Sequence, residues 1–243
     1  MPTPRPDGRR ADQLRPIKLT RGFTEMAAGS VLAEFGRTRV LCTATWTDGV
    51  PSFLGTNDQG WLTAEYAMLP GSGQGRTPRE RGGKVDGRAT EIQRLVGRAL
   101  RTVLDLKALT RKTIWLDCDV LQADGGTRCA AITGAYVALV DCVLAMDRAR
   151  LVKSWPILGS VAAVSVGVVS GEPRLDLAYA EDVDADVDAN VVMNGRGEFI
   201  EIQAASERAP LTRTSLHSLL TLAEGGVKEI LALQKSALGP VAR

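Results

Sequence analysis

The chain has 243 residues, of which 44% are hydrophobic and 24% are charged, and its formal net charge is +2. These values are typical of a globular protein and exclude a disordered, collagenous or coiled-coil chain. The 30 basic and 28 acidic residues nearly cancel, so the total charge does not indicate a nucleic-acid partner. That information must lie in how the charges are distributed.

The four cysteines are widely spaced and form no CxxC pair, which favours a reducing compartment and argues against a zinc knuckle. The arginine-containing start is not followed by the apolar segment of a secretory signal, and no stretch approaches about 18 uninterrupted apolar residues. We therefore expect a cytoplasmic protein with no membrane partner and no DNA partner.

The first half of the chain predicts strands, then one loop, then a helix. Alternation of small or apolar residues with polar ones predicts strands over 30–35, 38–47 and 61–69, the first two forming a hairpin. Residues 70–87 are rich in Gly, Arg and Pro, which predicts an exposed loop. From Arg88 onward, apolar residues recur every three or four positions and predict an amphipathic helix.

The second half alternates strands and helices. Strands are predicted over 114–121, 161–170, 174–179, 190–194 and 199–204. A helix is predicted over 130–146, after a glycine turn, and an amphipathic helix over 212–233 is expected to be interrupted at Gly225-Gly226. The interleaved order predicts a mixed α/β fold, and without a clear linker we expect a single domain over residues 1–243.

Basic and acidic residues are segregated along the chain. Seven arginines and one lysine lie between Arg76 and Arg101, against only three acidic residues, which predicts a local cationic surface. The sign reverses between Glu172 and Asp188, where seven acidic residues face a single arginine. One segment is therefore suited to anions and another to cations.

A glycine turn is the clearest candidate for anion binding. Asp124-Gly125-Gly126 follows a predicted strand and opens a predicted helix, so backbone N–H groups, the Thr127 hydroxyl and the Arg128 guanidinium could bind a phosphate-sized anion. A plain turn with a surface arginine explains the spacing equally well. Arg88 lies at the start of the preceding predicted helix. An arginine there opposes the helix dipole, which favours an interpretation in which Arg88 is a second arginine that binds the same anion.

The acidic run from Glu181 to Asp188 alternates carboxylates with small apolar residues. In an extended conformation its four aspartates (182, 184, 186 and 188) would share one side, and Mg²⁺ or Mn²⁺ would relieve their repulsion. A solvated acidic loop is the commoner structure for such a run. Because the only histidine, His217, lies in the last predicted helix, catalysis would use arginines, hydroxyls, carboxylates and metal, as in phosphoryl chemistry.

Four sequence segments carry a family resemblance: RPDGR at 5–9, GR at 87–88 with EIQRLVGR at 91–98, DCDVLQADGGTR at 117–128, and DVDANVVM at 186–193. Together they resemble the ribonuclease PH family of phosphorolytic exoribonucleases, and the likeness extends over nearly the whole chain. The resemblance implies a fold like domain 2 of ribosomal protein S5 and a homohexameric ring built as a trimer of dimers. It also implies phosphate-dependent trimming of tRNA precursors, and of other structured RNA with 3′ extensions, from the 3′ end.

By position, the resemblance also implies roles for individual residues. Inorganic phosphate, as co-substrate, would be bound by Arg88, Gly126, Thr127 and Arg128. Mg²⁺ would be bound by Asp182 and Asp188, which with Arg128 form the catalytic set. RNA would be bound by Arg76, Arg79, Arg81, Arg94 and Arg98. Phosphate would attack the last phosphodiester bond and release a nucleoside 5′-diphosphate, and the reverse addition of nucleotides is expected as well.

Three positions depart from the family pattern. Cys129 stands where a threonine is expected, the loop 71–75 lacks an arginine, and Gln203-Ala204-Ala205-Ser206-Glu207 keeps only the flanking Gln and Glu. Two other functions stay open: a non-catalytic ring subunit that binds RNA, and a hydrolytic nuclease that uses metals on the acidic run and releases nucleoside monophosphates. The complete set of candidate residues favours the phosphorolytic enzyme.

Overall fold

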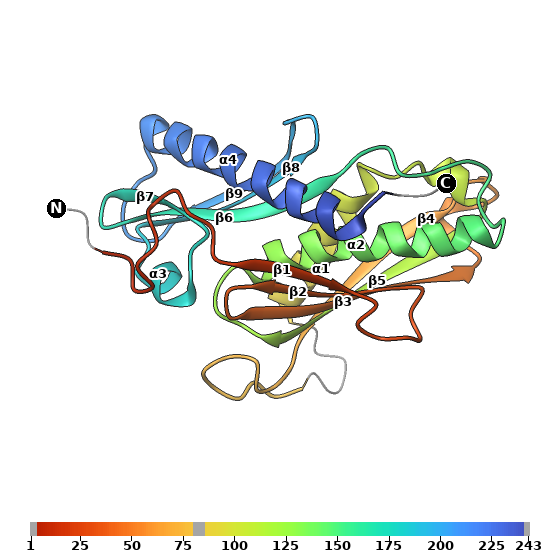
Figure 1. The fold of residues 1–243 in the computed structure, drawn as a ribbon, viewed down its shortest axis with the longest axis horizontal. Helices are drawn as coiled ribbons and strands as arrows, with labels where there is room; N and C mark the ends of the chain where they lie inside the picture. The colour runs from red at the N-terminus through yellow and green to blue at the C-terminus, as the bar shows by residue number, and fades with distance from the viewer. Residues whose placement is uncertain (1–3, 80–85, 241–243) are drawn as a thin grey trace.

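Two β-sheets dominate the computed structural model, which describes residues 4–79 and 86–240 (Figure 1). The first sheet has the order β1-β2-β3-β5-β4 and the second the order β7-β6-β8-β9. The first sheet contains β1 (Ile17–Arg21), β2 (Gly29–Phe35), β3 (Thr38–Asp48), β4 (Trp61–Met68) and β5 (Lys112–Gln122). The second contains β6 (Val161–Val169), β7 (Glu172–Leu175), β8 (Val187–Asn194) and β9 (Phe199–Ser206). Neighbouring strands are antiparallel except β4 and β5, whose parallel pairing requires the crossover that α1 provides.

The helices form layers with the sheets. They are α1 (Gly87–Arg101), α2 (Thr127–Arg148), α3 (Tyr179–Val183) and α4 (Arg213–Leu238), with short 3₁₀ helices η1 (Ser52–Leu54) and η2 (Leu106–Leu109). α2 lies between the sheets and packs on β2 and β3 on one side and on β6 on the other, while α4 packs on β6 and β7 (Figure 1). β6 is buried along its whole length because helices cover both of its faces. One continuous hydrophobic core therefore joins both sheets to α1, α2 and α4.

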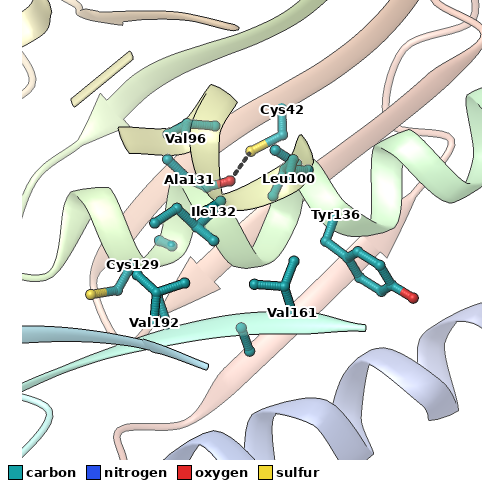
Figure 2. Close-up of a cluster of buried hydrophobic side chains, with 14 of the residues drawn as sticks. Cys42, Val96, Leu100, Cys129, Ala131, Ile132, Tyr136, Val161 and Val192 are labelled. Atoms are coloured by element: carbon teal, nitrogen blue, oxygen red, sulfur yellow. Dashed lines mark hydrogen bonds between the residues drawn. The ribbon is translucent and has the colours of Figure 1, made fainter. Parts of the chain in front are cut away.

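The position of α2 explains its composition. Among the described residues it is the one helix long and apolar enough to cross a membrane, yet 89% of its most apolar window is buried inside the molecule. In Figure 2, Ile132 and Tyr136 of α2 lie between Leu100 of α1 and Val161 of the second sheet. A helix that is covered on nearly all sides needs no polar face, so this one is a core helix.

Most predicted elements are confirmed, with small shifts of their ends. The hairpin is β2–β3, with Phe35 paired to Thr38 at its tight end. The strand after it, the helix that starts near Arg88 and the strand, glycine turn and helix around residue 125 are all present. The strand predicted over 174–179 is confirmed only at Arg174 and Leu175, because β7 begins at Glu172 and ends at Leu175.

Three features differ from the sequence predictions. β1 was not predicted, because its five residues are too short to show a clear alternation. α4 continues through Gly225-Gly226 without a break. A Cβ on Gly226 would lie 2.7 Å from Leu175 Cδ1, so the glycine lets α4 lie close to β7, and this packing offsets its low helix propensity. The third difference is α3, a short helix in part of the acidic run, for which the sequence suggested either an extended segment or a solvated loop.

Candidate active site

A cleft of about 470 Å³ is lined by the loop after β4, the start of α1, the glycine turn before α2, and α3. It brings together residues that are far apart in sequence. Five of the predicted site residues line it: Arg76, Arg88, Gly126, Thr127 and Asp182. Three of the candidate phosphate residues, one candidate RNA residue and one of the two candidate metal residues therefore share a cavity, and Arg128 and Asp188 are not among the residues that line it.

The glycine turn between β5 and α2 presents backbone N–H groups to this cleft. Gly125 and Gly126 have positive φ angles of 78° and 66°. Gly126 is the N-cap of α2, and no side chain of the described residues caps the helix there. A Cβ on Gly125 would lie 2.6 Å from the carbonyl oxygen of Leu177, so this position requires glycine for space as well as for its φ angle. The first N–H groups of α2 are available to an anion.

The Thr127 hydroxyl is oriented by a buried tyrosine. Tyr66, on β4, donates its hydroxyl hydrogen to Thr127 Oγ1 at 2.8 Å. Burial raises the pKa of Tyr66 and outweighs the lowering effects of the Thr127 hydrogen bond and of Arg88 and Arg128, so the phenol keeps its proton. Because Thr127 accepts from Tyr66, its own hydrogen can point elsewhere and can be donated to a bound anion.

Arg128 and Arg88 add positive charge from two different helices. Arg128 Nη1 donates to Gln203 Oε1 at 2.7 Å and is 3.4 Å from Glu91 Oε1, and these contacts hold the guanidinium over β9. Arg88 is exposed at the first turn of α1, where Asp86 caps the helix by accepting from its backbone N–H at 3.1 Å. Both guanidinium groups are close enough to lower the pKa of Asp182 and Asp188.

The structure corrects the expected arrangement of the acidic run. Asp182 lies on α3, Asp184 caps the end of that helix, and Asp188 lies on β8, so the four aspartates do not share one side of a strand. The helix forms because Glu181 is buried beneath it in ion pairs, which an extended run could not provide. Asp182 and Asp188 still come close enough for their charges to interact.

These two carboxylates bind protons more tightly than ordinary aspartates. Burial raises the pKa of Asp182, against the lowering effect of Arg88, Arg128 and Arg15. Burial, followed by repulsion from Asp182, raises the pKa of Asp188 to about 6. Within residues 4–79 and 86–240, no ion pair or side-chain hydrogen bond neutralises either carboxylate. A cation bound between the two carboxylates would therefore reduce their repulsion and stabilise their ionised forms.

The donor set suits Mg²⁺. Two carboxylates provide hard oxygen ligands, and Mg²⁺ commonly binds one or two carboxylates together with water and substrate phosphate. The described part of the chain has no cluster of three or more acidic, histidine or cysteine side chains that could form a complete protein cage. Asp182 and Asp188 thus fit an ion that is shared with a phosphate-containing substrate, and they do not fit a closed structural site.

The arginines predicted for RNA binding occupy different places. Arg76 lines the cleft, Arg79 is exposed on the same loop, and Arg81 lies outside the described residues. Arg94 and Arg98 line a separate hollow of about 190 Å³ beside Trp61 and Arg101. Arg98 Nε also donates to Glu201 at 2.8 Å. The structure therefore brings Arg76 to the site and leaves the α1 pair on another surface.

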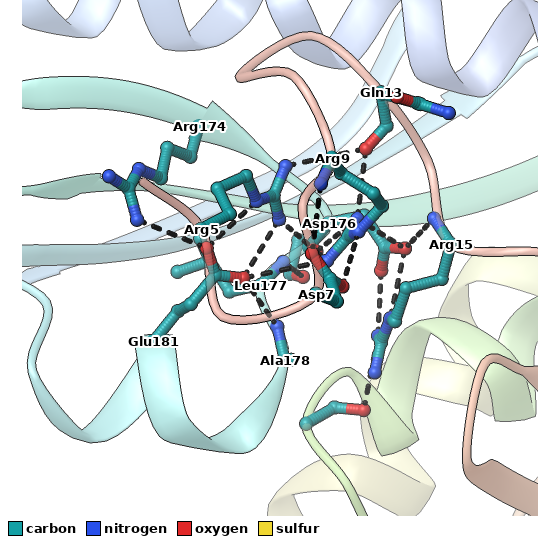
Figure 3. A network of polar contacts seen from close by, with 12 residues as sticks. Arg5, Asp7, Arg9, Gln13, Arg15, Arg174, Asp176, Leu177, Ala178 and Glu181 are labelled. Carbon is teal, nitrogen blue, oxygen red and sulfur yellow. Dashed lines mark hydrogen bonds and ion pairs between the residues drawn. The ribbon is translucent and has the colours of Figure 1, made fainter. Parts of the chain in front are cut away.

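Residues 5–15 contribute a buried ion network that sequence reasoning missed (Figure 3). Arg5 pairs with Glu181 at 2.8 Å, and Arg15 pairs with Asp176 at 2.7 Å. All four residues are almost fully buried. The only signal in the sequence was the opposite charge of two distant segments, which does not define pairs.

The departure at Cys129 lies away from the cleft. Cys129 is buried in the core, its Sγ is 3.3 Å from Asn190 Oδ1, and burial strongly raises the pKa of the thiol (Figure 2). Gln203, which the chain retains from the 203–207 segment, is the residue that orients Arg128. Neither departure removes a group from the site.

Comparison with known proteins gives the family. The 3′ exoribonuclease family, domain 1, matches residues 13–145, and domain 2 of the same family matches residues 159–226. The chain belongs to the 3′ exoribonuclease family. It is 56% identical to ribonuclease PH of Corynebacterium efficiens over 236 residues, which covers 97% of this chain and 96% of the relative.

Two solved structures share the fold. Rice (Oryza sativa) Rrp46 superposes with a TM-score of 0.78 at 21% identity, covering 97% of this chain and 100% of Rrp46. A chain of the Archaeoglobus fulgidus exosome with RNA bound to the active site gives a TM-score of 0.81 at 21% identity, covering 94% of this chain and 92% of that one. The α/β architecture of these two structures is thus the architecture described above.

Proposed function

We propose that the protein is a phosphate-dependent 3′-to-5′ exoribonuclease that releases nucleoside 5′-diphosphates from the 3′ ends of tRNA precursors. The observation that carries the proposal is the cleft itself, in a chain of the 3′ exoribonuclease family. An uncapped helix N-terminus, an oriented hydroxyl and an arginine lie in the same cavity as a carboxylate that binds a proton tightly. A hydrolytic enzyme would need the carboxylates but would have no use for the anion site.

The anion site would hold the attacking phosphate. The N–H groups of the α2 N-terminus, the Thr127 hydroxyl and the guanidinium groups of Arg88 and Arg128 donate hydrogen bonds to it and offset its charge. Without this positive charge, two phosphate groups would repel each other at bonding distance. Holding the nucleophile in line with the bond that breaks removes much of the entropic barrier.

The bond changes balance without a further reactant. An oxygen of inorganic phosphate forms a bond to the phosphorus of the last phosphodiester, and the bond from that phosphorus to the 3′ oxygen of the preceding nucleotide breaks. The last nucleoside leaves with two phosphates, and the shortened RNA keeps a 3′ hydroxyl after taking up a proton. The reverse reaction uses the same groups, so nucleotide addition from diphosphates is part of the proposal.

Asp182 and Asp188 would hold Mg²⁺, which when bound supplies positive charge next to the scissile phosphate.

Arg76, Arg79 and Arg81 would attract the RNA backbone toward the cleft. Arg94 and Arg98 would extend that contact along α1. Because phosphate contacts carry no sequence information, these arginines would position RNA of any sequence.

We also propose a single domain that assembles as a homohexamer, a trimer of dimers, in the cytoplasm. The continuous core that joins both sheets supports one domain, although the family divides at residues 145–159. The four free cysteines, all buried, support a reducing compartment. Analytical ultracentrifugation of the purified chain tests the assembly, and a sedimenting species of one or two chains would contradict it.

The decisive experiment follows a labelled phosphate. A 3′-extended tRNA is incubated with the protein and Mg²⁺, with and without radiolabelled inorganic phosphate, and the products are separated. We expect nucleoside diphosphate that carries the label on its outer phosphate, and no product when phosphate is omitted. Unlabelled nucleoside monophosphate formed without phosphate would show a hydrolase, and bound RNA without any product would show a non-catalytic RNA-binding subunit.

A further inference from the structure

The segment that precedes β1 brings three arginines beneath the two loops that carry the candidate site. The side chains of Arg5, Arg9 and Arg15 are 2%, 7% and 4% exposed. None of them is among the residues that line the cleft. Since burying an unpaired guanidinium is very costly, each must be matched by acceptors, and each of the three donates to Asp176 or Glu181, which lie shortly before Asp182 in the sequence.

Arg15 joins the glycine turn to the loop that follows β7. Its Nε and Nη2 donate to the two carboxylate oxygens of Asp176 at 3.0 and 2.7 Å. Its Nη1 donates to the carbonyl oxygen of Asp124 at 2.5 Å, and Nη2 is also 3.4 Å from the carbonyl oxygen of Gly125. One planar guanidinium thus binds both sides of the junction (Figure 3).

The same junction is held tightly from the other directions. Thr38 Oγ1, on β3, donates to the Gly125 carbonyl at 2.7 Å and accepts from the Asp124 N–H at 2.9 Å. The N–H of Tyr179, the first residue of α3, donates to the Asp124 carbonyl at 3.2 Å. Asp176 has a φ angle of 54°, a conformation that a non-glycine residue keeps only when its surroundings fix it. The turn and the start of α3 therefore form one unit.

Arg5 binds α3 on its buried side. Its Nε and Nη2 donate to the two oxygens of Glu181, each at 2.8 Å, and Nη2 also donates to the Asp176 carbonyl at 2.9 Å. Glu181 in turn accepts from the Ala178 N–H at 3.1 Å, which closes the first turn of the helix. Asp182 is the next residue, so the position of its carboxylate depends on this bidentate pair.

We propose that Arg15 and Arg5 are positioning residues for the reaction: through Asp124, Gly125 and Glu181 they set the anion-binding turn and Asp182 at a fixed separation. The inference rests on the proposed function. Neither arginine lines the cleft. A displacement of about 1 Å in such a site costs on the order of 100-fold in rate, so small losses of fit behind the cleft have kinetic effects.

Lysine substitutions separate positioning from folding. Arg15→Lys keeps the buried charge, but one ammonium nitrogen replaces the three guanidinium nitrogens that bind both oxygens of Asp176 and the Asp124 carbonyl, so it cannot keep all of these contacts. We expect its KM for inorganic phosphate to rise about 10- to 100-fold with an unchanged KM for RNA. Arg5→Lys acts on α3 and should lower kcat with a smaller effect on the phosphate KM. The matched control is Arg10→Lys, because Arg10 is 76% exposed and pairs only with the surface residue Asp12.

A purely structural role predicts a different result. If Arg15 only stabilises the fold, Arg15→Lys should have a lower urea midpoint than the wild type and an unchanged KM for phosphate in its folded state. That result would overturn the proposal. If Arg15→Lys does not fold, Thr38→Val removes the hydroxyl that holds the same turn, and it must raise the phosphate KM. An unchanged KM in that variant would also overturn the proposal.

Failure of the proposed function can be told apart from failure of this inference. If the wild-type protein releases product without phosphate, the function is wrong. The positioning role is then judged by calorimetric titration with inorganic phosphate alone. Arg15→Lys must bind phosphate at least about tenfold more weakly than both the wild type and Arg10→Lys. Equal affinities, or no phosphate binding by the wild type, would refute it.

Discussion

Replacing Asp188 by asparagine should stabilise the metal-free protein at neutral pH while it abolishes turnover. Burial and the charge of Asp182 raise the pKa of Asp188 to about 6. At pH 8 the wild-type carboxylate is ionised at an energetic cost that the unfolded chain does not have. The asparagine amide would have nearly the same shape as the carboxylate and no charge, so the variant avoids that cost but loses the proposed ligand for Mg²⁺.

The sign and the size of this stability change follow from the pKa of Asp188 in the folded protein and its ordinary pKa. Because the folded pKa of Asp188 lies above its ordinary value of 3.8, the folded state binds the proton more tightly. The stability that this proton provides is complete below pH 3.8 and is lost as the pH rises through about 6. The whole effect is about 3 kcal/mol, since each tenfold change in proton affinity is worth about 1.4 kcal/mol. About 1.4 kcal/mol of it is lost between pH 5 and pH 8.

The assay is urea unfolding in EDTA at a fixed protein concentration, from pH 5 to pH 8. The free energy of unfolding of Asp188→Asn, relative to wild type, should rise by about 1.4 kcal/mol over this range. Asp12→Asn, at a carboxylate that is 59% exposed, serves as the matched surface control, against which the Asp188→Asn difference is compared. Adding Mg²⁺ should raise the free energy of unfolding of the wild type more than that of Asp188→Asn. A flat or falling difference for Asp188→Asn would refute the claim that this carboxylate is ionised at a cost.

Three further changes test the anion side of the cleft. Arg128→Lys should lower kcat/KM for inorganic phosphate about 100-fold with unchanged RNA affinity by filter binding, because lysine lacks the planar fork; equal kinetics would exclude the assigned role. Tyr66→Phe should raise the phosphate KM about fivefold, or about 1 kcal/mol, because Thr127 loses its orienting donor; an unchanged KM would mean that the hydroxyl needs none. Gly125→Ala should destabilise the fold more than Gly171→Ala in urea unfolding. Both have φ angles near 75°, but only the Gly125 Cβ meets a carbonyl oxygen; equal losses would refute the steric argument.

Local patterns in the sequence were enough to predict the elements that form one side of the cleft. The apolar stripe of α1 and the Asp124-Gly125-Gly126 turn are encoded in consecutive residues, and the structure places both where the cleft needs them. Arg88 could be selected because a cation at a helix start is unfavourable without an anion. These inferences required no knowledge of long-range pairing.

The acidic side could not be predicted in the same way. Whether Glu181 is extended and solvated or helical and buried depends on Arg5, which is 176 residues away in sequence. The sequence left two conformations open for this run, an extended segment and the commoner solvated loop, and neither of them describes the short helix α3. Only the fold brings residues 5–15 against the buried side of α3, and this contact lets Glu181 be buried.

Two neighbouring carboxylates show how the fold divides structural from functional charge. Burial alone would raise the pKa of Glu181, but the hydrogen bonds and charge of Arg5 outweigh it and hold the pKa below the ordinary value of 4.5. The pKa of Asp182, one residue later, is raised by burial, because the nearby arginines do not form an ion pair with it. An arginine that paired directly with Asp182 would stabilise the fold but would occupy the oxygens that a cation needs. The network under α3 therefore stabilises the loop through Glu181 and leaves Asp182 open to the cleft, and this division lets the same acidic segment serve the core and the site.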